Sequence, residues 1–203
     1  LLDSARQEAA TSGYKLHIIG DMAGDPSPPD LNSPLLYSLN ATTNYHFNDQ
    51  ANNWDRVLAN TATYYPQWLS TMNSKDISFV PDAYPGFNNT NNTGASEPWT
   101  ILQPNSDSFG QMLQTALNNT SSPQGFVMVT SWNEWLEGTQ IEPSMESGEL
   151  FLHVVYDAVK TPPTEPAPCP IWPLIGSAVL GAIIAAGIVT FYFLKQKRHK
   201  TTP

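Results

Sequence analysis

Two glutamates three residues apart, Glu134 and Glu137, are the residues best suited to acid–base chemistry in this chain. They lie in the segment 130–143, TSWNEWLEGTQIEP, which directly follows the clearest strand pattern, GFVMVT at 125–130. If the chain turns helically here, the Cβ atoms of residues i and i+3 are about 5–6 Å apart. Two carboxylates this close do not both ionise freely, so the pKa of one rises and that group can act as a general acid.

The side chains around the glutamates favour a carbohydrate ligand. Cleavage of a glycosidic bond needs one group that protonates the leaving oxygen and another that acts as base or nucleophile. Trp132 and Trp135 offer apolar faces for sugar rings, and Asn133 could bind a hydroxyl or orient Glu134. Glutamates at this spacing also occur on solvated helix faces, and tryptophans also pack in cores. Catalysis, glycan binding without catalysis and a structural role are therefore all open on spacing alone.

Apolar runs alternate with helical patterns through residues 1–160. The sequence predicts strands and helices in turn, with strands at 14–19, 42–47, 77–81 and 125–130 and helices at 53–72, 109–117 and 150–159. Residues 1–12 look like the end of a further amphipathic helix. Strand–helix alternation implies βα units around a parallel sheet. A (β/α)8 barrel has eight such units in about 250 residues, so residues 1–160 predict an α/β fold that is the C-terminal half of a TIM-type barrel.

Residues after the other predicted strands are further candidates for the site, because barrel enzymes place their chemistry at the carboxyl ends of strands. Tyr45 and His46 lie at the end of the second predicted strand, and Asp82 and Tyr84 follow the third. We predict that these four residues bind substrate together with the segment 132–135.

Two further chemical roles find less support in the sequence. Glu142 could bind substrate, but a turn carboxylate before Pro143 is the more conservative interpretation. The four histidines and the single cysteine have no spacing typical of a metal site, so we expect neither a metal nor a cofactor.

The C-terminal region has the composition of a membrane anchor. Residues 161–170 contain five prolines and predict an extended juxtamembrane linker. The uncharged stretch 171–194 is 24 residues long, and about 20 residues cross a bilayer core as a helix. The basic tail 195–203 follows. The positive-inside bias therefore predicts a type I single-pass protein in the lipid bilayer, with residues 1–170 lumenal or extracellular and the tail cytoplasmic.

Glycosylation sequons and charge agree with this topology. Five sequons lie before the predicted span, at Asn40, Asn88, Asn91, Asn118 and Asn119. Residues 1–170 hold five of the nine Lys and Arg residues and all eighteen Asp and Glu residues, a net charge of −13. This charge argues against nucleic acid as a partner.

Three segments resemble a known enzyme family. Residues 132–142, WNEWLEGTQIE, resemble the signature of glycoside hydrolase family 99 and its WbsX-like relatives. Residues 79–88, FVPDAYPGFN, resemble the family's strand that ends in a Pro-Gly-aromatic loop, and residues 43–47 resemble its preceding strand. The resemblance covers about residues 14–155 and implies a (β/α)8 barrel.

The resemblance also implies an activity, that of a retaining, endo-acting glycoside hydrolase that forms an epoxide between C1 and C2 of the sugar. By position, Glu134 resembles the residue that deprotonates the 2-hydroxyl. Glu137 resembles the general acid that protonates the leaving group and later activates water. Leu136 stands where the family's endo-α-mannosidases have His, so mannose is not implied. Some WbsX-like relatives are described as glycosyltransferases, which leaves the direction of transfer open.

Overall fold

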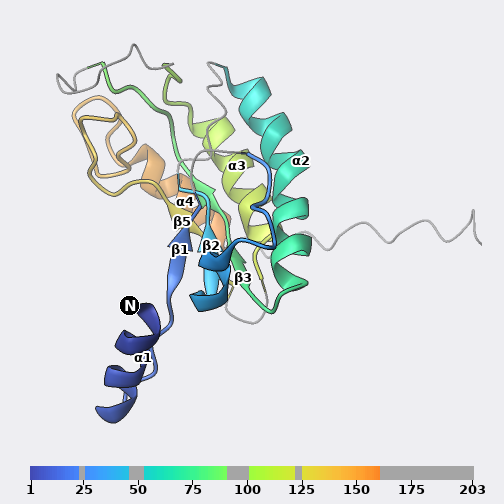
Figure 1. The fold of residues 1–203 in the computed structure, drawn as a ribbon. Coiled ribbons are helices and arrows are strands. Elements are labelled where there is room, and N and C mark those ends of the chain that lie inside the picture. Colours follow the sequence, from blue (N-terminus) through green and yellow to red (C-terminus); the bar gives the residue numbers. More distant parts are fainter. Residues whose placement is uncertain (23–25, 46–52, 91–100, 122–124, 161–203) are drawn as a thin grey trace, which may run out of the picture. The chain divides into compact units, whose positions relative to one another are not determined.

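The computed structural model describes residues 1–22, 26–45, 53–90, 101–121 and 125–160 (Figure 1). The elements follow in the order α1 (Leu2–Thr11), β1 (Ile19–Asp21), the 3-10 helix η1 (Pro34–Ser38), β2 (Ala41–Thr43), α2 (Trp54–Asn73), β3 (Ser78–Val80), β4 (Asp82–Ala83), α3 (Ser106–Asn118), β5 (Met128–Val129) and α4 (Leu150–Lys160).

The described strands pair in parallel and in chain order. β1 pairs with β2, β2 with β3, and β4 with β5. Pro81 separates β3 from β4 because proline has no N–H for the ladder. The Pro81 carbonyl accepts from the Met128 N–H at 2.9 Å. Parallel strands in sequence order with helices between them are the units of a TIM-type barrel, present here in part. The predicted α/β class is confirmed.

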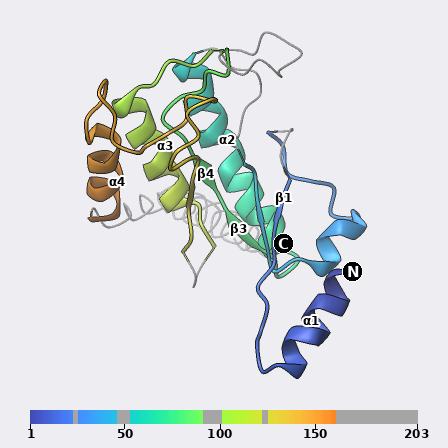
Figure 2. The same ribbon diagram turned by 90° about the vertical axis from the view of Figure 1, so that its left-hand side faces the viewer.

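The helices predicted at 53–72, 109–117 and 150–159 correspond to α2, α3 and α4. They lie side by side in that order, and α2 and α3 cover one side of β3 and β4 (Figure 2). Two asparagines start the first two of these helices. The side chain of Asn53 accepts from the Arg56 N–H at 2.9 Å, and that of Asn105 accepts from the Ser108 N–H at 2.8 Å.

The predicted strands are longer than those observed. The strand predicted at 14–19 is wrong over most of its length, because β1 begins only at Ile19. Its partner β2 begins at Ala41, so the ladder cannot extend back to Tyr14, whose side chain is 71% exposed. The strand predicted at 42–47 ends at Thr43, and that at 125–130 is reduced to the two residues that face β4.

Aromatic packing joins the helices to the strands. The Phe79 ring on β3 stacks on the Trp68 ring at 5.2 Å and meets the edge of the Tyr65 ring at 5.7 Å. All three side chains are fully buried. The rings of Phe109 and Phe151 lie 6.1 Å apart and connect α3 to α4. Full burial of each such ring stabilises the fold by about 1.5–3 kcal/mol.

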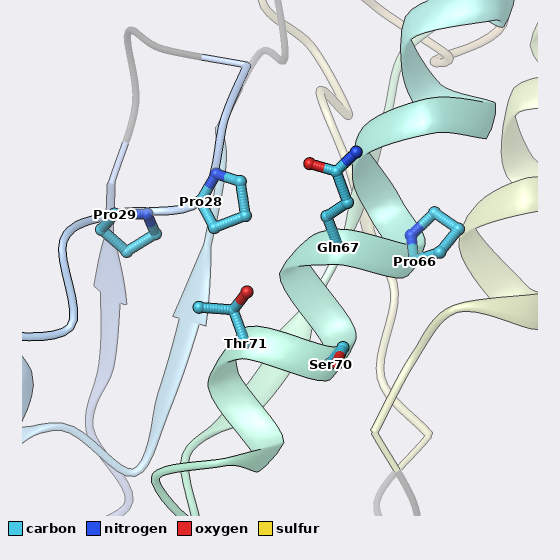
Figure 3. Close-up of a pocket in the computed structure, with 6 residues that line it drawn as sticks. All are labelled: Pro28, Pro29, Pro66, Gln67, Ser70 and Thr71. Atoms are coloured by element: carbon cyan, nitrogen blue, oxygen red, sulfur yellow. The ribbon is translucent and has the colours of Figure 1, made fainter.

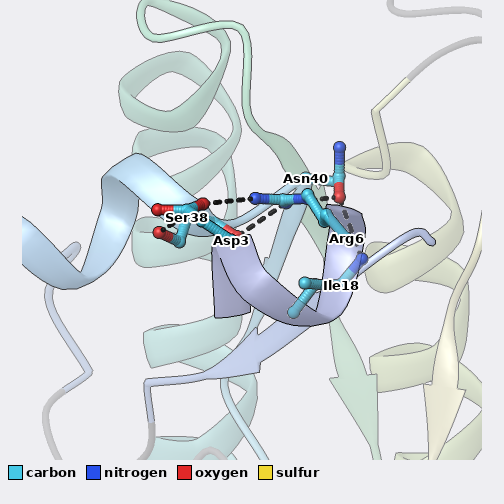
Figure 4. A network of polar contacts seen from close by, with 5 residues as sticks. All are labelled: Asp3, Arg6, Ile18, Ser38 and Asn40. Atoms are coloured by element: carbon cyan, nitrogen blue, oxygen red, sulfur yellow. Dashed lines mark hydrogen bonds and ion pairs between the residues drawn. The ribbon is translucent and has the colours of Figure 1, made fainter. Parts of the chain in front are cut away.

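A polar tether holds α1, which buries none of its own residues. The Arg6 guanidinium donates to the Ser38 carbonyl at 2.7 Å and to Asn40 Oδ1 at 2.8 Å, and the Ile18 N–H donates to the same Oδ1 at 2.9 Å (Figure 4). Asn40 belongs to a predicted sequon whose third residue, Thr42, is buried in β2. Glycosylation at Asn40 stays a prediction.

Across the described residues, no helix has the length and apolarity required to cross a membrane. The predicted linker 161–170, span 171–194 and tail 195–203 lie outside those residues, as do His46 and Asn91.

Phe79→Ala tests the aromatic packing. Loss of its ring contacts with Trp68 and Tyr65 should lower the free energy of unfolding by about 3–5 kcal/mol. Tyr37→Ala is the matched control, because the Tyr37 side chain is 75% exposed and its loss should change stability by less than about 0.5 kcal/mol. Chemical denaturation of the protein that contains this chain measures both, and equal losses would contradict the assigned core.

Candidate functional site

Ser131 closes the loop that carries both glutamates. Its N–H donates to the Thr139 carbonyl at 2.9 Å, and its Oγ lies 2.8 Å from Thr139 Oγ1. The same Oγ accepts from the Glu134 N–H at 2.9 Å. Residues 135–138 form turns and not a helix, so the condition under which the i, i+3 spacing was considered is not met. One small polar side chain therefore sets the path of the chain between β5 and the carboxylates.

Gly138 brings the loop against the segment that follows β4. Its φ is +62°, and an added Cβ would lie 3.3 Å from the backbone N and O of Asn88. The Asn88 N–H donates to the Glu137 carbonyl at 2.6 Å. A side chain at position 138 would strain the backbone and crowd this contact, which explains the glycine.

Tyr45 meets Glu137 across the sheet. Its side chain, two residues beyond β2, forms a hydrogen bond with the Glu137 carboxylate. The Tyr45 N–H donates to Asp21 Oδ1, at the end of β1, at 3.0 Å. Residues at the carboxyl ends of β1 and β2 and in the loop after β5 therefore converge, as the barrel arrangement requires.

The electrostatics of the site distinguish the two glutamates. Burial raises the pKa of the half-buried Glu137, the Glu134 carboxylate raises it further, and the Tyr45 hydrogen bond lowers it. Burial is the largest cause, so the neighbouring carboxylate on which the spacing argument relied is the second. Burial, followed by the charges of Glu137, Asp82 and Glu134, raises the pKa of Tyr45 to about 12. Tyr45 is therefore a neutral donor at physiological pH.

Asp82 and Tyr84 lie beneath this surface, with side chains 0% and 1% exposed. Thr130 Oγ1 lies 2.8 and 2.9 Å from the two carboxylate oxygens of Asp82, and the Tyr65 hydroxyl donates to the Asp82 carbonyl. Asp82 acts on the site through its charge, which helps to raise the pKa of Tyr45. Direct contact of Asp82 or Tyr84 with substrate stays a prediction.

Trp132, Asn133 and Trp135, in the same loop as the two glutamates, are exposed. The Trp132 side chain is 52% exposed and the Trp135 side chain 45%. The Trp135 indole N–H donates to Glu142 Oε2 at 2.9 Å. The tryptophans therefore do not pack in the core, and their surfaces are available to a ligand.

The sequence prediction missed Asn44. Its side chain is 2% exposed, and neither its Oδ1 nor its Nδ2 has a hydrogen-bond partner. Gln140 Oε1 and the hydroxyls of Thr42 and Thr43 are likewise buried without a partner. Leaving a buried polar group unpaired costs about 1–3 kcal/mol. The only signal in the sequence was that Asn44 is a polar residue next to Tyr45. Its burial could not be predicted, because burial depends on tertiary contacts.

One groove lies apart from the carboxylates. A groove of about 570 Å³ runs between α2 and the loop that follows β1 (Figure 3), and its lining residues are Pro28, Pro29, Pro66, Gln67, Ser70 and Thr71. None of these has an ionisable side chain, so the groove does not supply acid–base chemistry. Among the residues that the structure describes, no group of three or more His, Cys, Asp or Glu side chains could hold a metal ion.

The parallel strands, the helices that cover them and the site at their carboxyl ends point to one class, α/β proteins of the TIM-barrel type. Residues 18–155 match the family described as Glycosyltransferase WbsX, and the chain belongs to that family. The predicted resemblance to WbsX-like and family 99-like proteins is confirmed.

Individual relatives agree with this membership. A glycoprotein endo-alpha-1,2-mannosidase-like protein of Danio rerio is 29% identical over 121 residues, which are 58% of this chain and 24% of the relative. The uncharacterized protein WxcX of Xanthomonas campestris is 26% identical over 149 residues, 71% of this chain and 20% of the relative. The chain thus spans about a quarter or less of these relatives.

A solved structure shows the same fold. A glycoside hydrolase-like protein superposes with a TM-score of 0.60 at 20% sequence identity. The match covers 77% of this chain and 48% of that protein. At this identity the likeness shows the fold alone.

Tyr45→Phe tests the site's electrostatics. Because the Tyr45 hydrogen bond lowers the pKa of Glu137, its loss should raise that pKa. Glu134→Gln removes a negative charge and should shift the same pKa downward. ¹³C NMR titration of the glutamate carboxyls measures both shifts. Shifts of equal sign, or none in Tyr45→Phe, would contradict the arrangement.

Proposed function

We propose that this chain forms the catalytic C-terminal half of a barrel domain in a membrane-anchored glycoside hydrolase that cleaves glycosidic bonds in a glycan. The observation that carries the proposal is the placement of Glu137, which is half-buried beside Glu134 and hydrogen-bonded to Tyr45, where burial raises its pKa. A carboxyl that keeps its proton to higher pH is suited to protonate a leaving oxygen. The anchor is the predicted span 171–194, and carbohydrate is the partner.

The two glutamates divide the chemistry of the first step. Glu134 takes the proton from the sugar's 2-hydroxyl, and O2 then displaces the glycosidic oxygen from C1 to form an epoxide. Glu137 gives its proton to the departing oxygen. In the second step the Glu137 carboxylate takes a proton from water, the water oxygen attacks C1, and the C1–O2 bond of the epoxide breaks as Glu134 returns its proton to O2. Each step conserves its protons, and two displacements at C1 retain its configuration.

The identity of the sugar in the substrate follows less directly from these residues than the reaction does. The name of the Danio rerio relative makes an α-1,2-linked mannose oligosaccharide the first substrate to test. Leu136 lies in an exposed turn between the glutamates, where the mannosidases have His, so other sugars belong in the same screen. The alternatives are a glycan-binding protein without catalysis and a glycosyltransferase, which the family's description favours. The raised pKa of Glu137 supports hydrolysis over simple binding, because glycan binding alone needs no general acid.

Activated substrates test the two roles separately. In the full-length protein, Glu137→Gln should lose about 10²–10⁴-fold in rate on the oligosaccharide and recover most of its first-step rate on a glycosyl fluoride, because fluoride leaves without a proton. Glu134→Gln should lose rate on both substrates, because its task is at the 2-hydroxyl. Pre-steady-state kinetics measures the first step.

A 2-deoxy fluoride is the control, and the wild type should leave it intact. Equal losses in both variants on both substrates would contradict the division of roles. If the wild type binds the oligosaccharide without turnover, the protein is a glycan-binding protein instead.

A further inference from the structure

Glu142 is hydrogen-bonded to both exposed tryptophans of the loop that carries the two glutamates, residues 131–142. Its N–H donates to the Trp132 carbonyl at 2.8 Å, and its Oε2 accepts from the Trp135 indole N–H at 2.9 Å. One residue at the end of the loop therefore fixes the backbone at the first tryptophan and the ring of the second.

The position of Glu142 is itself well determined. The preceding residue, Ile141, is buried and donates its N–H to the Ser131 carbonyl at 2.9 Å. Ser131 is also the residue whose hydroxyl accepts from the Glu134 N–H. Ser131 thus forms hydrogen bonds both with the residue before Glu142 and with the backbone of Glu134.

The charge of Glu142 is separate from the acid–base pair. The causes that shift the pKa of Glu137 are burial, Glu134 and Tyr45. Glu142, although it is a carboxylate in the same loop, is not one of them. Its observed contacts are with the Trp132 carbonyl and the Trp135 indole instead.

An indole ring that is fixed in one orientation beside the two glutamates can serve as a binding surface. The Trp135 side chain is nearly half exposed, and an indole on a surface turn has several rotamers unless a contact selects one. A hydrogen bond to a carboxylate is stronger than one between neutral groups and fixes the edge of the indole. Because the N–H lies in the plane of the ring, the bond itself occupies neither apolar face, and such faces bind the apolar side of a sugar ring.

We propose that Glu142 is a positioning residue that orients the Trp135 ring as a platform for a sugar ring next to Glu134 and Glu137. The inference rests on the proposed function, since it names the part of the site that holds the substrate. Glu142 does not touch the sugar.

The experiment uses the full-length protein and an α-1,2-linked mannose oligosaccharide. The protein is labelled with 5-fluorotryptophan, and the ¹⁹F NMR resonance that disappears in Trp135→Phe is that of Trp135. Glu142→Ala should shift and broaden this resonance, and Glu142→Gln, which keeps an acceptor oxygen, should shift it less. Glu146→Ala removes an exposed carboxylate four residues further on and should leave the resonance unchanged.

Kinetics supplies the second readout. Glu142→Ala should raise KM about tenfold with kcat within about twofold, because the platform binds ground state and transition state alike. Glu142→Gln should recover most of this loss. In the Trp135→Phe background, Glu142→Ala should raise KM no further, because the ring that it held by the N–H is gone.

Two results would overturn the proposal. One is a Trp135 resonance that is the same in Glu142→Ala as in the wild type. The other is an equal rise in KM in the Trp135→Phe background, which would mean that Glu142 contacts the sugar itself. Absence of wild-type turnover would contradict the proposed function, whereas the ¹⁹F measurement decides the anchoring of Trp135 in either case.

Discussion

The hydrogen bonds of Ser131 are the constraint on which the site depends. They close the loop after β5 onto Thr139 and fix the N–H of Glu134. Because that loop also meets the segment after β4 at Gly138, the position of Glu137 is defined by two strand ends. Short polar contacts thus hold the site at the carboxyl edge of the strands. Aromatic packing joins the same strands to α2.

The electrostatic asymmetry of the glutamates follows from this placement. Glu137 lies lower in the site, where burial raises its pKa, and the Tyr45 hydrogen bond partly offsets the rise. Glu134 is exposed at the rim. Buried Asp82 adds negative charge below and helps to keep Tyr45 neutral. A half-buried carboxyl with a raised pKa beside an exposed carboxyl is an arrangement suited to acid-assisted displacement.

Much of the fold could be predicted from the sequence, because α2 repeats its buried residues at helical spacing and asparagines mark the starts of α2 and α3. Strand bounds could not, because ladder length depends on the partner, as the late start of β1 opposite Ala41 shows. The pair Glu134 and Glu137 was predicted from its spacing and motif, and the structure places the two in one loop with Glu137 half-buried. The burial of Asp82 and Asn44 and the bond between Trp135 and Glu142 arise from tertiary contacts, which no local pattern encodes.

The central claim is that this pair performs a displacement that retains configuration at the anomeric carbon. The most direct test follows the first product of the full-length protein acting on an α-1,2-linked mannose oligosaccharide by ¹H NMR, before mutarotation. The account predicts that the α anomer appears first, because two successive displacements at C1 restore its configuration. A first product with the β configuration would contradict it.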